Sequence, residues 1–303
     1  MTSHDAHRGL REYLILGAGL LAISVSAILI RYAGDAPGEA VAVWRTVFAS
    51  LLLLPVALVK SDKEIRAITK REWMLIVVSG IFLGLHFVTW ISSLYHTNVA
   101  SASTLVSLSP IFLAIMGFAV LGEKPRRIEI IAILTATAGT VALGWADQVS
   151  AEQVHGDNPL LGNGLALTAA ALVSVYLLIG RHVRQRLGWL AYVAPLYVVT
   201  ALTTWVVALL RDIPLTGYPM HVYVLCFGMA VIPQLIGHGS LNYVVRFFPA
   251  ATIGLASLFE PVGASLLAFA FFGEVPSLTG AIAMIIILAS VGWAMQPEKD
   301  NAS

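Results

Sequence analysis

One carboxylate in this sequence stands where a charged group is costly. Glu260 lies in SLFEPVGASLLAFAFFGEVP (257–276), about 11 residues, roughly 16 Å, into an apolar run that begins near residue 249. If this run crosses a membrane as a helix, the carboxylate costs several kcal/mol unless it is protonated, paired or open to water. We expect it to face a bundle interior. There it could bind an ammonium group, carry a proton, or be a structural partner of Arg45 or of a backbone donor.

Arg45 is the only basic residue expected well inside a membrane segment. It lies about seven residues, roughly 10 Å, into the apolar segment 38–59. This depth is large enough to require a partner and small enough for the side chain to extend toward the membrane surface. With a single arginine available, we do not expect a site for phosphorylated ligands.

Polar residues recur at every fourth position in the apolar segment 220–244 and just beyond it. They are Gln234, His238, Asn242 and Arg246, and they follow Pro233. Residues four apart share one face of a helix. Because hydrocarbon disfavours such a face, we expect it to line a polar path or to contact another helix.

His86 and Trp90 have the same spacing in the segment 73–95. Together with the polar face of 220–244, they would line a central cavity with polar and aromatic groups. A single histidine within a membrane is more often a satisfied hydrogen-bonding residue than a proton carrier. The presence of two histidines strengthens the hypothesis of a proton carrier only modestly.

Three further residues are candidates for the same cavity. Tyr95 and Tyr176 could grip an apolar or aromatic ligand, although core packing is the more common role of such residues. Ser107 belongs to the hydroxyl-rich stretch SASTLVSLSP (101–110). Small hydroxylated residues let helices approach closely in membranes, so packing is the first interpretation of Ser107 and a hydrogen bond to a zwitterion the second.

The elements that position these residues are membrane helices, as the composition indicates. The 303-residue chain is 58% hydrophobic and 12% charged, whereas soluble domains are about a quarter charged. Ten apolar segments are long enough to cross a hydrocarbon core of roughly 30 Å. They are 13–33, 38–59, 73–95, 98–121, 128–146, 160–180, 189–210, 220–244, 249–272 and 277–295. We therefore predict an all-α integral membrane protein with ten transmembrane helices.

The same composition excludes several classes of function. The longest polar segment is about 14 residues, too short for a soluble catalytic domain. The net charge of +1 indicates no nucleic-acid partner. The single cysteine, Cys226, cannot form an internal disulfide and is expected to pack. We expect no cofactor and no metal.

The sequence contains an internal repeat. SLSPIFLAIMGFAVLGEKP (107–125) aligns with 258–276 without gaps, at an offset of 151 residues. The matched positions include Pro110 with Pro261, Glu123 with Glu274, and Ser109 with Glu260. Each half of the chain then holds five predicted helices, and because five is odd, the second half must cross the membrane in the opposite direction. Inverted repeats of this kind recur in secondary transporters.

These patterns predict the division and orientation of the chain. The first five-helix repeat is expected at 1–147, an extracytoplasmic linker at 148–158, and the inverted repeat at 159–303. Most of the 18 lysines and arginines fall in cytoplasmic segments if the N-terminus is cytoplasmic. The positive-inside rule therefore places both termini in the cytoplasm.

The ten-helix layout, the segment VWRTVFASLLLL (43–54) and the paired endings P…LGEKP and EP…FGEVP resemble the EamA branch of the drug/metabolite transporter (DMT) superfamily. Over nearly the whole chain, the sequence is similar in length and layout to exporters of amino acids in the bacterial inner membrane, including YddG-type aromatic amino-acid exporters. The resemblance implies export of small amphipathic metabolites without ATP hydrolysis. It also implies a scaffold role for Arg45 rather than substrate binding, and it leaves a structural role for Glu260 as open as a functional one.

Alternating access is the mechanism that this resemblance implies. Pro110 and Pro261, each expected in a helix interior, would break a backbone hydrogen bond and provide bending points. Glu123 and Glu274 are expected to mark helix ends, with structural or gating roles. The expected partners are a small-molecule substrate and the lipid bilayer, and the chain could be a monomer or a homodimer.

Two other classes of function stay open. One is a membrane-embedded enzyme, although HExxH and GxSxG motifs are absent. The other is a non-transporting membrane scaffold. Within carriers, a multidrug exporter or an exporter of other metabolites is the alternative to an amino-acid exporter.

Overall fold

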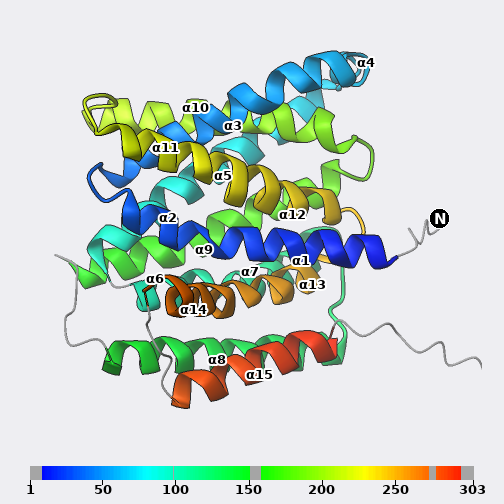
Figure 1. Ribbon diagram of the computed structural model, residues 1–303. Coiled ribbons are helices and arrows are strands. Elements are labelled where there is room, and N and C mark those ends of the chain that lie inside the picture. Colours follow the sequence, from blue (N-terminus) through cyan, green and yellow to red (C-terminus); the bar gives the residue numbers. More distant parts are fainter. Residues whose placement is uncertain (1–8, 98, 151–157, 273–277, 295–303) are drawn as a thin grey trace, which may run out of the picture.

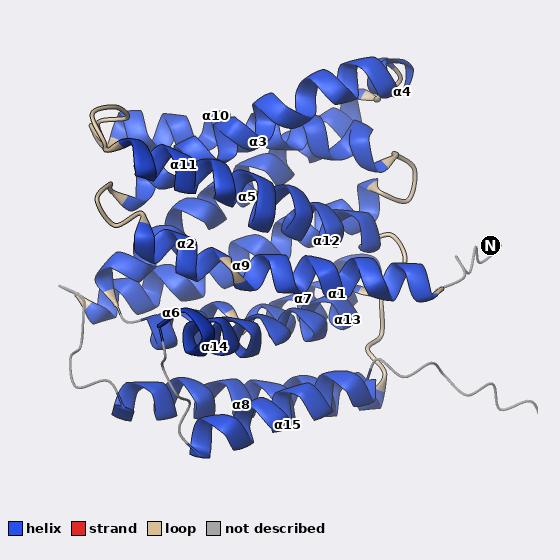
Figure 2. Ribbon diagram, in the orientation of Figure 1, coloured by secondary structure: helices blue, strands red, loops and turns tan. Residues whose placement is uncertain are grey.

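The computed structural model describes residues 9–97, 99–150, 158–272 and 278–294. Within these ranges every regular element is a helix and there is no strand (Figure 2). The prediction of an all-α chain is therefore confirmed for the described residues. Eight helices in this part of the chain are long and apolar enough to cross a membrane. They are Leu10–Tyr32, Gly38–Lys60, Lys70–His96, Ala102–Leu121, Pro159–Val183, Trp189–Leu210, Met220–Val244 and Ala250–Phe271.

These spans are built from shorter elements. The first half of the chain supplies α1 (Leu10–Ser24), α2 (Ser26–Tyr32), α3 (Gly38–Lys60), α4 (Asp62–Arg66), α5 (Lys70–His96), α6 (Val99–Val106), α7 (Ser109–Leu121) and α8 (Arg127–Ser150). The second half supplies α9 (Pro159–Val183), α10 (Trp189–Leu210), α11 (Met220–Met229), the π-helix η1 (Ala230–His238), α12 (Gly239–Val244), α13 (Ala250–Ser257), α14 (Phe259–Phe272) and α15 (Leu278–Ala294). The two remaining predicted spans, 128–146 and 277–295, correspond to α8 and α15.

Helices from the two halves pack against one another in corresponding pairs. The helix α3 packs on α10, α7 on α13, and α8 on α15. The long contact of α5 with α9 in turn has a counterpart in the contact of α1 with η1 and α12. Figure 1 shows the helices running roughly side by side, with α8 and α15 together along one side of the bundle. The two halves of the chain are thus interleaved rather than separate.

Four of the spans are interrupted, and two of the interruptions have a local cause in the sequence. Between α1 and α2, Ser24 Oγ donates to the Leu20 carbonyl at 2.9 Å, a bond that often bends helices. The regular α-helix is also interrupted by a turn between α6 and α7 and at Leu258, between α13 and α14. In the fourth span, η1 contains Pro233, and proline removes one bond of the helical ladder.

Pro110 and Pro261 occupy the first turns of α7 and α14, directly after two of these interruptions. Proline is well tolerated there because the first N–H groups of a helix have no partner within it. The expected position in a helix interior is therefore corrected. Each proline lies in the first turn of a helix, and the break lies before it.

One end of the bundle is rich in arginine. At this end α1, α5 and α13 begin and α3, α7 and α9 end (right in Figure 1). We call it the basic end. Its described arginines are Arg11, Arg66, Arg71, Arg126, Arg127, Arg181, Arg184, Arg186 and Arg246.

Candidate functional site

An interior cavity of about 50 Å³ lies where the interrupted spans meet. We call it the central cavity. Its polar lining consists of Ser26, Arg45, His86, Ser107, Ser109, His238, Ser257 and Glu260, and its aromatic lining of Phe87 and Trp90. Irregular backbone at membrane depth is tolerated only when it is buried in protein or lines a cavity. The position of the helix breaks around the cavity agrees with this rule.

The structure brings most of the predicted cavity residues to this place. The predicted residues that line the cavity are His86, Trp90, Ser107, His238 and Glu260. Arg45, predicted as a scaffold residue, lines it as well. Their role in binding stays a prediction.

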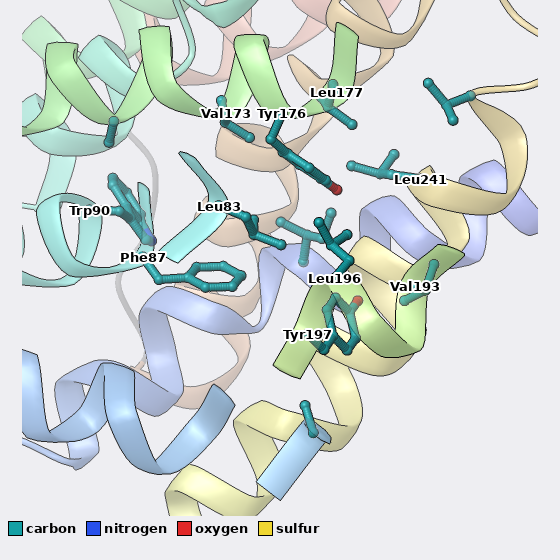
Figure 3. Packing of buried hydrophobic residues seen from close by; sticks show 14 of the residues in the cluster. Leu83, Phe87, Trp90, Val173, Tyr176, Leu177, Val193, Leu196, Tyr197 and Leu241 are labelled. Atoms are coloured by element: carbon teal, nitrogen blue, oxygen red, sulfur yellow. The ribbon is translucent and has the colours of Figure 1, made fainter. Parts of the chain in front are cut away.

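Tyr176, Gln234 and Asn242 are completely buried behind the lining. Asn242 Nδ2 donates to Tyr176 Oη at 3.0 Å and to the His238 carbonyl at 2.8 Å. The carbonyl of Gln234 accepts from Tyr197 Oη at 2.8 Å. Figure 3 shows Tyr176 reaching from α9 toward Leu241 of α12. These residues hold η1 and α12 against α9 and α10 and do not line the cavity.

Tyr95 is the predicted cavity residue that lies elsewhere. Its hydroxyl donates to the Ala36 carbonyl at 2.9 Å, next to the start of α3. Tyr95 is about 7 Å farther along α5 than Trp90. It therefore contributes to helix packing at the end opposite the basic end.

His86 and His238 lie close together, with ring centroids 6.1 Å apart. His86 Nδ1 is 2.9 Å from the Ala169 carbonyl. Because a carbonyl only accepts, Nδ1 carries the proton, and Nε2 of the neutral ring is an acceptor. His238 Nδ1 is 3.5 Å from Tyr176 Oη. Among the described residues, no group of three or more His, Cys, Asp or Glu side chains could hold a metal ion.

Arg45 is 1% exposed and only partly bonded. Its Nε donates to Gln234 Oε1 at 3.2 Å. Its Nη1 and Nη2 are buried and have no hydrogen-bond partner in the described part of the chain. Glu260 lines the same cavity without bonding to these two nitrogens.

Phe87 is a cavity residue that the sequence patterns did not single out. It is 1% exposed, its ring centroid is 4.2 Å from Arg45 Cζ, and it lies edge-on to His238 at 5.0 Å. Figure 3 shows Phe87 on α5 together with Leu83 and Trp90. The 151-residue offset pairs Phe87 with His238. The repeat therefore contained the signal that identifies this position.

A second cavity, of about 280 Å³, lies at the basic end between α7, α8 and α13. Glu123, one of its lining residues, accepts from Arg181 Nε at 2.7 Å and from the backbone N–H of Ala250 at 3.0 Å. Gly122 has a positive φ of 68° and ends α7; this conformation favours glycine. Glu123 is thus placed at a helix end, where it joins α7 to α9 and α13. Its repeat partner Glu274 lies outside the described residues.

Arg184 is also buried at this end, with 2% exposure. Its Nε donates to the Asn242 carbonyl at 2.9 Å, and its Nη1 donates to the Leu187 carbonyl. Burial lowers the pKa of Arg184 to about 10, which leaves it charged at neutral pH. On the nearby surface, a hydrogen bond to Glu72 raises the pKa of Arg186.

Comparison with known proteins agrees with the duplicated sequence. The profile of the EamA-like transporter family matches residues 10–145 and 160–295. No curated protein matches the chain. A solved structure described as "Crystal structure of protein" has a TM-score of 0.77 at 20% sequence identity, covering 94% of this chain and 97% of that chain. At this identity the likeness concerns the fold alone. Because the family profile matches the chain twice and covers most of it, the protein belongs to the EamA-like transporter family, a family of membrane transporters.

Proposed function

We propose that the protein is a secondary transporter that exports amino acids and related small metabolites by alternating access. The observation that carries the proposal is the central cavity, where a buried arginine, a carboxylate and two histidines from both halves meet. Secondary transporters bind substrate near the midplane, between repeats and beside discontinuous helices. An amino acid carries an ammonium and a carboxylate, and the cavity contains a residue of opposite charge for each.

The proposed architecture is ten transmembrane helices in two inverted repeats, at 1–147 and 159–303. The corresponding packing pairs, such as α3 with α10 and α8 with α15, support it. The basic end would face the cytoplasm of a bacterial cell, because positive residues favour that side of the inner membrane. Substrate would then enter from the basic end.

The sizes of the two cavities support a moving carrier. The central cavity, at about 50 Å³, has room for only a few water molecules. The basic-end cavity is larger, at about 280 Å³. We assign this larger cavity to the entrance. Export then requires the Glu123–Arg181 contact and the packing of α7 on α13 to open, followed by closure behind the substrate.

The lining also supports a preference among substrates. Phe87 and Trp90 offer aromatic surface next to the charged groups, which suits amino acids with aromatic or apolar side chains. Arg45, the one basic residue of the lining, shares the cavity with Glu260. This balance disfavours phosphorylated metabolites, which carry two negative charges.

Counterflow in proteoliposomes tests the proposal. Vesicles loaded with one unlabelled amino acid should accumulate the same labelled amino acid transiently, and protein-free vesicles should not. A panel that includes phenylalanine, leucine, alanine and a sugar phosphate measures selectivity. Absence of counterflow for every amino acid would overturn the proposal and favour an enzyme or a scaffold. Counterflow of unrelated cations alone would favour a multidrug exporter.

Glu260→Gln provides a second measurement with the same vesicles. We expect it to weaken amino-acid counterflow at every pH, because the amide no longer offers a negative charge to the substrate ammonium. Normal transport by this variant across a range of pH would remove Glu260 from the proposed site.

A further inference from the structure

The guanidinium of Arg45 is buried and held in one orientation. Its Nε donates to Gln234 Oε1 at 3.2 Å, and its Cζ lies 4.2 Å from the centroid of the Phe87 ring. The backbone carbonyl of Gln234 accepts a hydrogen bond from Tyr197 Oη. One hydrogen bond and one aromatic face thus position the guanidinium, while its Nη1 and Nη2 remain available.

Arg45 and its partner Gln234 carry three buried donor atoms that are not satisfied. Nη1 and Nη2 of Arg45, and Nε2 of Gln234, are buried without a hydrogen-bond partner among the described residues. Leaving a buried donor unpaired is costly. A carboxylate supplies a negative charge and two acceptor oxygens, and it matches the guanidinium fork in bidentate geometry.

Glu260 does not supply this carboxylate in the structure. It lines the same cavity, yet Nη1 and Nη2 of Arg45 have no partner. Glu260 belongs to the first turn of α14. Arg45 and Glu260 therefore share the cavity without a hydrogen bond between them.

The corresponding turn of the other repeat has no charged side chain. There Ser109 begins α7, and no side chain caps this helix. Pro110 has no N–H, and the Ile111 N–H donates to the Leu108 carbonyl at 3.0 Å. The start of α7 therefore offers few free donors, and Arg45 is the group of the cavity that suits the anionic end of a ligand, whereas Glu260 suits the cationic end.

We infer that Arg45 binds the carboxylate of the transported substrate, with Gln234 and Phe87 as positioning residues. The inference rests on the proposed function and narrows it. The substrates are zwitterions that carry a free carboxylate, and amines or amides of the same shape are not substrates. Arg45 then has a binding role in place of the scaffold role that the family resemblance implied.

The test compares phenylalanine with phenylalaninamide and phenethylamine, which keep the ring and the amino group but lack the free carboxylate. Binding is measured by ligand-induced thermal stabilisation of the purified protein, and transport by counterflow. The wild type should prefer phenylalanine. Arg45→Gln should weaken phenylalanine binding at least about 30-fold and leave amide binding nearly unchanged. Arg45→Lys keeps the positive charge but loses the bidentate guanidinium geometry. Its affinity for phenylalanine should lie between those of the wild type and Arg45→Gln.

Arg184→Lys is the matched control, because this arginine is equally buried but lies outside the central cavity. It should retain the preference for phenylalanine over the amide. Size-exclusion chromatography identifies variants that do not fold, and Arg45→Lys then replaces Arg45→Gln as the deciding variant.

Three outcomes would overturn the inference. The first is a wild type that binds the three compounds equally or binds none of them. The second is an Arg45→Gln variant that keeps the acid-over-amide preference. The third is recovery of phenylalanine binding in Arg45→Gln/Glu260→Gln, which would make Arg45 only a counter-charge for Glu260. Arg45-dependent binding of phenylalanine without any counterflow would instead support the inference and overturn the proposed transport function.

Discussion

Arg45 in the central cavity and Arg184 at the basic end are both almost completely buried, with 1% and 2% exposure. Their partners differ. Arg184 donates to the carbonyls of Asn242 and Leu187. Arg45 donates to the side chain of Gln234 and leaves both terminal nitrogens unpaired in the described part of the chain.

The same contrast holds for the neighbouring side chains. At the basic end, Arg181 donates to Glu123 and to the carbonyls of Val245 and Arg246. In the central cavity, Glu260 and Arg45 do not bond to each other. Burial alone therefore does not separate a structural arginine from a binding one. The bonded arginines hold chain segments together, whereas the unsatisfied one can take an anion only from a ligand or through a conformational change.

Replacing each buried arginine by lysine gives the largest expected difference between the two regions. Arg45→Lys should lower amino-acid counterflow about 10- to 30-fold, because lysine lacks the planar fork. Its thermal stability should stay near that of the wild type. Arg184→Lys should retain transport and lose about 2 kcal/mol of stability, since one buried carbonyl loses its donor. Counterflow measures transport, and thermal unfolding in detergent measures stability. Loss of transport in Arg184→Lys together with loss of stability in Arg45→Lys would contradict the comparison.

Gly254→Ala probes the packing between the two cavities. A Cβ at this position would lie 2.8 Å from Pro110 Cα and 3.1 Å from Leu113 Cδ1. We expect a loss of about 1–3 kcal/mol of stability through overpacking of α13 on α7. Gly164→Ala is the control, because a Cβ there would meet nothing within 4 Å. Equal stability of the two variants would show that the crossing of α7 and α13 is not tight.

Glu123→Ala tests whether the hydrogen bonds that Glu123 accepts keep the basic end closed. It removes the partner of Arg181 and of the Ala250 N–H, and about 1.4 kcal/mol lost from the closed state corresponds to roughly a tenfold shift in the equilibrium. A cysteine at Ala251, which lines the basic-end cavity, should then react faster with a membrane-impermeant maleimide. Both variants carry Cys226→Ala, so that the introduced cysteine is the only one in the sequence.

Asp62→Ala is the control for this experiment. It breaks the exposed ion pair with Arg66 at the same end of the bundle, and exposed pairs contribute little. Labelling at position 251 should not change. If Glu123→Ala also left the labelling rate unchanged, Glu123 would have no part in closure.

The smallest expected effect separates two tyrosines that the sequence treated alike. Tyr95→Phe removes a hydrogen bond to the Ala36 carbonyl and should cost about 1 kcal/mol of stability without affecting transport. Tyr176→Phe removes the acceptor of Asn242 and the neighbour of His238, so transport should fall a few-fold as well. Loss of transport in Tyr95→Phe would place the substrate path nearer the His96 end of α5 than the central cavity.

Much of the central cavity could be predicted from the sequence because depth and helical face are local properties. The position of Glu260 within an apolar run and the four-residue spacing that includes His238 required no knowledge of other helices. Tyr95 was misplaced because a helical period identifies a face but not how far along the helix the cavity extends. Phe87 was missed because an apolar residue in a membrane helix has no distinctive local signal.

The sequence by itself determined the membrane setting, the all-helical class and the internal duplication, because hydrophobicity, segment length and repeat offset depend only on the order of residues. Only the tertiary structure decided which polar residues are satisfied. Arg45 and Gln234 are 189 positions apart, and Arg181 and Glu123 are 58 apart. Hydrogen-bond satisfaction depends on such distant partners, so the bonded Arg184 and the unsatisfied Arg45 could be told apart only after the helices had packed.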